Sequence, residues 1–252
     1  MNELFKDTKI WCISLIERDD RYECALNEFK KVGITAEFHR PTRNPISGAM
    51  GCFLAHKYCL ENSDGKNVLI FEDDVKFSNK WREKIPQIHE FLQDNDEYDT
   101  LRLGIFMRCV YKHKRNTKYI SKCKGTANHA VLYNKKFVTK LLTRPDFDGS
   151  LPIDDYLVSL PEYNDFSFID NMCYQRSIAS DNLWANVFEQ GILQSYYVYE
   201  PWQYLINSSF HFIFWLPPRV QEKICFVNIS DNIMNFAAYI YSFYGKENKK
   251  GK

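Results

Sequence analysis

Residues 67–75 read NVLIFEDDV and join an apolar run to three consecutive acids. The apolar part is short and continuous, which is typical of a strand buried in a sheet. Glu72, Asp73 and Asp74 follow it directly. Neighbouring carboxylates repel one another and are costly to bury without partners, so we expect a cation at the end of this strand.

Strand and helix patterns alternate on both sides of this stretch. Amphipathic spacing predicts a helix that ends where Gly33 supplies a C′ glycine, and a second helix capped by Ser47. We expect strands at 10–15, 36–39, 68–71, 100–103 and 130–133, and helices at 20–32, 49–61, 81–92 and from Asn134 onward. This order predicts an α/β fold in which a mostly parallel sheet is flanked by helices on both faces.

The composition is that of a globular protein. The 252 residues carry a net charge of +1, so no overall field favours nucleic acid, and we expect none as a partner. The first residues lack the pattern of a secretory signal, and no apolar run approaches the roughly 20 residues of a transmembrane helix. We therefore expect a cytoplasmic protein, with peripheral membrane contact and homo-oligomer formation left open.

The eight cysteines form no Cys-x-x-Cys pair, and several lie inside apolar segments. This placement is typical of buried free thiols, so we expect the cysteines to be mostly reduced. Cys109 and Cys123 flank a loop and are the first candidates for an exception.

Two segments interrupt the alternating pattern. Residues 106–124 are rich in lysine and arginine and form either a solvated loop or hairpin, or a basic flap near an anionic ligand. Residues 182–252 are aromatic and irregular. An amphipathic helix expected at 229–244 packs against the core or a partner, or lies on a membrane surface. We therefore divide the chain into a main domain at 1–181 and a C-terminal extension at 182–252.

A series of short motifs runs across residues 10–181. They read WCISLIERDDRYE at 11–23, GAMGCFLAHKYCLE at 48–61, VLIFEDDV at 68–75, YDTLRLG at 98–104, GTANHAVLYNKKF at 125–137 and LPIDDYL at 151–157. In this order they resemble glycosyltransferase family 25, which includes lipopolysaccharide-type galactosyltransferases and collagen hydroxylysine galactosyltransferases. Three positions depart from the family pattern. Ala55 stands where that family usually has serine, Asn128-His129 disturbs the alignment of the motif at 125–137, and Ser180-Asp181 matches only loosely.

The resemblance implies a GT-A-like, Rossmann-related fold and a particular reaction. A hexose, most commonly galactose, would move from a UDP-sugar to a hydroxyl group with inversion at the anomeric carbon. The donor would be UDP-galactose or UDP-glucose, and the acceptor a glycan or a hydroxylysine-type peptide. The resemblance also implies a divalent cation, Mn²⁺ or Mg²⁺, as cofactor.

The same resemblance assigns residues to this chemistry. Asp74 would hold the metal with Glu72, and the third ligand is left open between Asp181 and His211. A base must take the acceptor's proton, and Asp154 is the first candidate, followed by Asp155. Donor contacts would come from Ile13, Ser14, Leu15, Arg18, His56, Glu72, Asp73, Gly125 and Thr126.

These assignments have structural alternatives. Alternation along a strand puts Glu72 and Asp74 on one face, where they would also suit an ion-paired strand end. Arg18 would equally be a surface charge at a helix start, and His56 a satisfied histidine on a core-facing helix. Two acids at a helix start also suit the helix dipole.

The function has alternatives too. The main one is a catalytically inactive glycosyltransferase-like protein that binds a sugar or a nucleotide. The retained acids argue against it. A nucleotidyltransferase would need a glycine-rich phosphate loop near the N-terminus, and the sequence has none.

Overall fold

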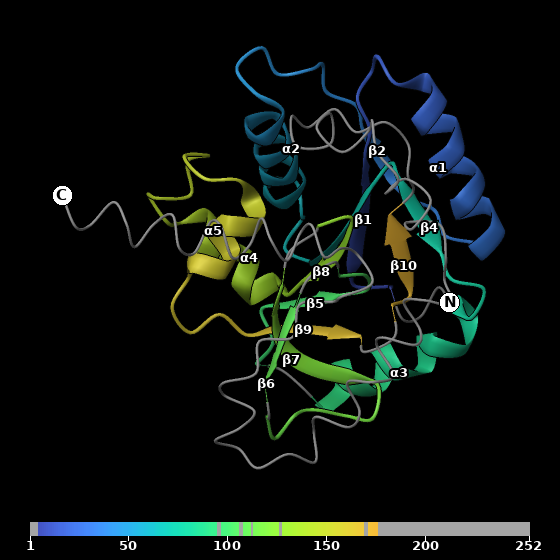
Figure 1. Ribbon diagram of the computed structural model, residues 1–252, viewed down its shortest axis with the longest axis vertical. Coiled ribbons are helices and arrows are strands. Elements are labelled where there is room, and N and C mark those ends of the chain that lie inside the picture. The colour runs from blue at the N-terminus through green and yellow to red at the C-terminus, as the bar shows by residue number, and fades with distance from the viewer. Residues whose placement is uncertain are drawn as a thin grey trace, which may run out of the picture.

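An eight-stranded mixed sheet forms the centre of the computed structural model (Figure 1). The structure describes residues 5–94, 97–105, 108–111, 113–125, 128–168 and 171–175, and only the backbone of residues 94 and 108–111. The strands of the sheet are β1 (Thr8–Ile13), β2 (Glu37–His39), β3 (Asn67–Glu72), β5 (Thr100–Arg102), β6 (Arg108–Tyr111), β7 (Ile120–Gly125), β8 (Ala130–Tyr133) and β9 (Asp165–Phe168). Their spatial order is β2-β1-β3-β8-β5-β9-β7-β6.

Most strands of this sheet point the same way. β1 pairs in parallel with β2 and β3, and β5 pairs in parallel with β9. β8 and β7 are antiparallel to each of their neighbours, so six of the eight strands share one direction. The predicted mostly parallel α/β sheet is therefore confirmed. The basic segment forms the antiparallel hairpin β6–β7 at one edge, which is the loop-or-hairpin alternative of the prediction.

The described helices are α1 (Asp19–Val32), α2 (Gly48–Glu61), α3 (Trp81–Asp94), α4 (Lys135–Leu142) and α5 (Ile153–Ser159). Four of these five begin within one residue of the predicted start, whereas α5 lies in no predicted helix range. Gly33 ends α1 with a left-handed φ of 70°. The side-chain oxygens of Ser47 and Asn134 accept hydrogen bonds from the backbone N–H groups of Met50 and Lys136, and so cap α2 and α4.

Helices cover both faces of the sheet (Figure 1). On one face α1 and α3 bury apolar side chains such as Phe29 and Ile88 against Leu69 and Phe71 of β3. On the other face α2, α4 and α5 pack residues such as Phe53 against the alternate side chains of β3 and β8. β3 is apolar on both sides because it is covered on both sides. This burial places its polar end, the acidic triplet, at the edge of two cores.

A second, two-stranded sheet follows the acidic triplet directly. β4 (Val75–Phe77) pairs antiparallel with β10 (Cys173–Gln175), and both lie beside α1 (Figure 1). The Phe77 N–H donates to Oε2 of Glu28 on α1 at 3.1 Å. The chain therefore turns at Asp73 and Asp74 between two fixed strands.

The remaining expectations about the whole chain have separate outcomes. The six cysteines with described side chains, Cys123 among them, form no disulfide with one another, as expected. The side chain of Cys109 lies outside the described residues, so the exception suggested for Cys109 and Cys123 stays a prediction. No helix within the described ranges is long and apolar enough to cross a bilayer. The boundary at 181, the extension 182–252 and its expected helix at 229–244 lie outside the described residues.

Candidate active site

The acidic triplet lies in an open pocket at the carboxyl ends of the parallel strands β1 and β3. Glu72 is the last residue of β3, and Asp73 and Asp74 form the turn that follows. The pocket has a volume of ≈ 330 Å³. Besides the triplet, its walls come from five places: the end of β1, Arg21 on α1, residues 41–47, the first turns of α2, and Gln175 on β10. Ligands of open α/β sheets bind at this edge of the sheet.

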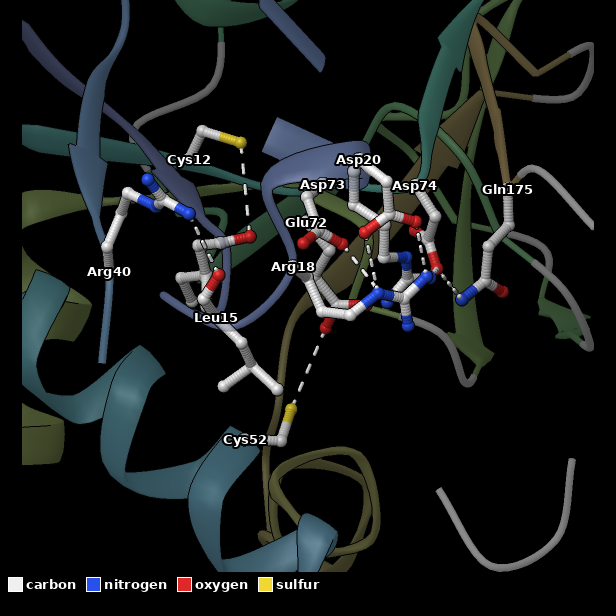
Figure 2. A network of polar contacts seen from close by, with 12 residues as sticks. Cys12, Leu15, Arg18, Asp20, Arg40, Cys52, Glu72, Asp73, Asp74 and Gln175 are labelled. Atoms are coloured by element: carbon white, nitrogen blue, oxygen red, sulfur yellow. Dashed lines mark hydrogen bonds and ion pairs between the residues drawn. The ribbon is translucent and has the colours of Figure 1, made fainter. Parts of the chain in front are cut away.

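Arg21 supplies the cation that the sequence led us to expect. It comes from the first turns of α1, and its guanidinium contacts Asp74 Oδ2 at 2.8 Å and Asp73 Oδ1 at 3.1 Å. All three side chains are at least nine-tenths buried. Gln175 adds a donor, because its Nε2 lies 3.0 Å from Asp74 Oδ2. Figure 2 shows the side chains of Asp74 and Gln175 pointing toward one another.

One arginine does not neutralise this group of acids. Burial raises the pKa of the Asp73 carboxyl to about 6, although Arg21 lowers it. Burial and the charge of Glu72 raise the pKa of Asp74 as well. Oδ1 of Asp74 is buried and has no hydrogen-bond partner. A buried carboxylate oxygen without a donor is costly, so the site favours a further positive group at this position.

Glu72 faces a different set of partners from its two neighbours. Its Oε1 lies 3.2 Å from His56 Nε2 and 3.7 Å from Cys52 Sγ, both on α2. Burial raises the pKa of Glu72, but the hydrogen bond and charge of His56 outweigh it and leave that pKa below its ordinary value. The strand ends at Glu72, so the alternation that would put it on one face with Asp74 does not continue. Asp73 and Asp74 instead share Arg21.

Cys52 completes this second group. Its side chain lines the pocket together with Glu72. Burial, then the charges of Glu72 and Asp154, raise the pKa of its thiol well above the ordinary value. The thiol is therefore protonated at neutral pH unless a cation replaces its proton.

The structure brings together part of the predicted donor-binding set. Ile13, Ser14 and Leu15 at the end of β1 line the pocket, with Glu72 and Asp73. His56 is fully buried behind them and reaches the pocket through Glu72. His56 is buried, as a core histidine would be, but only its Nε2 has a hydrogen-bond partner and its Nδ1 has none.

Other predicted donor residues do not line the pocket. Arg18 is the N-cap of α1 and forms a two-pronged ion pair with Asp20, at 2.9 and 2.8 Å. This pair lowers the pKa of Asp20 to about 2. Gly125 ends β7, opposite Arg108 in the hairpin. Thr126, Asp181 and His211 lie outside the described residues.

The predicted base lies on α5, on the α2 side of the sheet. Asp154 is half-buried and Asp155 is exposed, both in the first turn of that helix. Asp154 is near enough to Cys52 and Tyr133 to raise the pKa of each side chain. Of the two candidates, Asp154 therefore faces the pocket wall and Asp155 faces solvent.

Sequence reasoning missed two residues that the pocket uses. Arg21 stands inside the motif at 11–23 without being assigned to the site, and no motif includes Gln175. Both reach Asp74 from far along the chain, at separations of 53 and 101 residues. The signal for Arg21 was the acid triplet itself, which requires a buried cation. Gln175 had no comparable signal.

The fold and the pocket together define an α/β protein with a buried acidic centre at the edge of the sheet where ligands of such folds bind. The comparisons specify this further. The model of "Glycosyltransferase family 25 (LPS biosynthesis protein)" matches residues 39–149, which contain four of the six motifs, so the match supports the family resemblance and a glycosyltransferase. The matched range contains Cys52, His56 and the acidic triplet.

Solved structures give weaker likenesses. A197 from STIV is 14% identical, with 66% of this chain and 83% of that chain covered and a TM-score of 0.42. HddC from Yersinia pseudotuberculosis is 12% identical, with 69% and 73% covered and a TM-score of 0.37. These scores are too low to carry an inference about function. No curated protein matches the chain.

Proposed function

We propose that this chain is a metal-dependent, inverting glycosyltransferase with a GT-A-like fold. It moves galactose or glucose from a UDP-sugar to a hydroxyl group of a glycan or of a hydroxylysine-type peptide. The observation that carries the proposal is the buried, unpartnered Oδ1 of Asp74, in a pocket at the carboxyl ends of parallel strands. The family match over residues 39–149 supports sugar transfer as the reaction.

The pocket suits a nucleotide-sugar in size and charge. Its volume lies in the range of small-molecule sites. Ile13, Ser14 and Leu15 offer backbone groups at one wall, where a nucleoside would lie. Arg43 lines the same space, and together with a cation at Asp74 it would balance charge on a diphosphate.

Mn²⁺ or Mg²⁺ fits the oxygen donors of this pocket. Asp74 would hold the cation through Oδ1, with Glu72 as a second carboxylate, and Asp181 or His211 stays the candidate for a third ligand. Arg21 and Gln175 fix the other oxygen of Asp74 and so orient its carboxylate. When bound, the cation stabilises the charge that develops on the departing diphosphate.

Inversion by direct displacement requires a base near the acceptor hydroxyl. Asp154 would take that proton from the α5 side of the pocket, across from the diphosphate. Arg102 and Tyr133 lie in its electrostatic environment, on the sheet below it. Asp155 is the second candidate, although its exposure gives it no defined partner at the pocket.

The test is UDP release by the purified full chain with a panel of UDP-hexoses, in Mn²⁺ and in chelator. We expect release from UDP-galactose or UDP-glucose in Mn²⁺ only, and loss of release in Asp74→Asn. The matched control is Asp64→Asn, an exposed acid whose φ of 54° asparagine tolerates well. This variant should release UDP at the wild-type rate.

Calorimetry with UDP separates the outcomes when no release is seen. Mn²⁺-dependent UDP binding without turnover on any donor would support the inactive binding protein in place of the enzyme. No UDP binding with or without Mn²⁺ would overturn both.

A further inference from the structure

The side chains of Cys52, His56 and Glu72 form a compact group beside the acidic turn. Cys52 and His56 lie four residues apart on one face of α2, and Glu72 ends the neighbouring strand β3. Their ligand atoms Sγ, Nε2 and Oε1 all lie within 4.8 Å of one another. Within the described residues, this is the one group of three such side chains close enough to hold a metal ion.

The distances match the edges of a tetrahedron around a zinc ion. Bond lengths of about 2.0–2.1 Å to nitrogen and oxygen, and about 2.3 Å to sulfur, give tetrahedral edges of about 3.4 Å for N···O and about 3.6 Å for S···O. The observed separations are 3.2 Å for His56 Nε2 to Glu72 Oε1 and 3.7 Å for Cys52 Sγ to Glu72 Oε1. The third pair, the ligand atoms of Cys52 and His56, lies within 4.8 Å, and side-chain rotation would bring it onto the same ion.

The ligand types and charges also suit a soft divalent cation. A thiolate and an imidazole are preferred by Zn²⁺, whereas Mn²⁺ and Mg²⁺ prefer oxygen. The Cys52 thiolate and the Glu72 carboxylate together balance the charge of a divalent ion. Binding would release the proton of the Cys52 thiol to solvent, and no electron transfer is needed.

We propose that Cys52, His56 and Glu72 form a Zn²⁺ site on the wall of the pocket, next to the oxygen-ligand site at Asp74, with which it shares the carboxylate of Glu72. Cys52 and Glu72 line the pocket, so the fourth position of the ion faces its interior. Three protein ligands with an open fourth position are the pattern of zinc sites that bind a water or a substrate atom. The proposal is independent of sugar transfer, because the arrangement of the three side chains does not depend on a donor.

Cobalt substitution tests the site directly, since thiolate-bound Co²⁺ has a charge-transfer band in the near ultraviolet and tetrahedral Co²⁺ absorbs strongly in the visible. The full chain is stripped with chelator, desalted and titrated with Co²⁺. We expect both bands at one equivalent, and their loss when Zn²⁺ is added. Cys52→Ser should lose the charge-transfer band. Asp74→Asn should keep it, which separates this site from the one at Asp74.

Cys24→Ser is the matched control, because Cys24 is a half-buried free thiol on α1 outside the group. It should keep both bands, with circular dichroism confirming that each variant is folded. Absence of both bands in the folded wild-type chain would overturn the proposal. A charge-transfer band that persists in Cys52→Ser, or that disappears in Cys24→Ser, would overturn it as well.

Discussion

The ionised Asp73 carboxylate should lower the free energy of unfolding at neutral pH, and Asp73→Asn should remove this loss. The pKa of Asp73 is raised from 3.8 to about 6 by burial. Since one pKa unit corresponds to about 1.4 kcal/mol, carrying the ionised carboxylate costs the folded state roughly 3 kcal/mol above pH 6. Functional sites commonly carry such a cost.

The sign of the pH dependence follows from which state binds the proton more tightly. The folded state does, so the free energy of unfolding falls as pH rises from about 4 to about 6, and this contribution is constant above that range. An asparagine at this position has no charge to bury, and its carbonyl still accepts from Arg21. The variant should therefore match the wild type near pH 4 and exceed it by up to roughly 3 kcal/mol at neutral pH.

Urea unfolding followed by circular dichroism would measure this difference, at about pH 4.5 and about pH 7.5, in chelator. The exposed acid variant Asp64→Asn is the control and should show no pH-dependent gain. If Asp73→Asn were no more stable than the wild type at the higher pH, the reasoning about a buried uncompensated charge would be refuted. The same holds if the gain were equal at both pH values.

Three further changes test the structure at other positions. Arg102→Met should lower the free energy of unfolding in urea by about 3–5 kcal/mol. The change leaves the fully buried Asp165 carboxylate, which lies 2.8 Å from Arg102 Nε, without its cation. A smaller loss of stability in the double variant Arg102→Met with Asp165→Asn would confirm the cause. Gly104→Ala should lower the melting temperature, because its Cβ would lie 2.3 Å from the Cys173 carbonyl oxygen, and an unchanged melting temperature would contradict the packing of β10. Ser47→Ala should cost about 1 kcal/mol by removing the cap of α2, and Ser47→Asp should cost almost nothing.

Much of the fold was readable from local patterns. α2 and α4 begin at the capping residues Ser47 and Asn134, and α1 ends at Gly33, so these signals span only a few residues. The strands β1, β3 and β8 were predicted from apolar runs. β4 and β10, with three residues each, are too short for alternation to be visible. β9 carries Asp165 in a buried position, so its sequence does not look like a core strand.

The site was readable only in part, because its contacts join distant segments. The acids of the triplet and the end of β1 follow from strand position alone, since parallel strands end at one edge. Arg21 and Gln175 follow from no local pattern. The separate orientation of Glu72 depends on where the chain turns, which is set by the pairing of β4 with β10 rather than by the triplet.

Because Asp73 and Asp74 lie in the turn between β3 and β4, the pairing of β4 also sets the order in which the pocket is completed during synthesis. Arg21 and the three acids are all present once residue 74 has been made, but β4 gains its partner strand and Asp74 gains the amide of Gln175 only 101 residues later. Contacts of such long sequence separation form late because a large loop must close first. A nascent chain therefore carries its acids with a single arginine for much of its elongation. The binding centre is consequently among the last parts of the fold to mature, and a chain stopped before β10 would keep the sheet edge at β1 and β3 but lack a finished pocket.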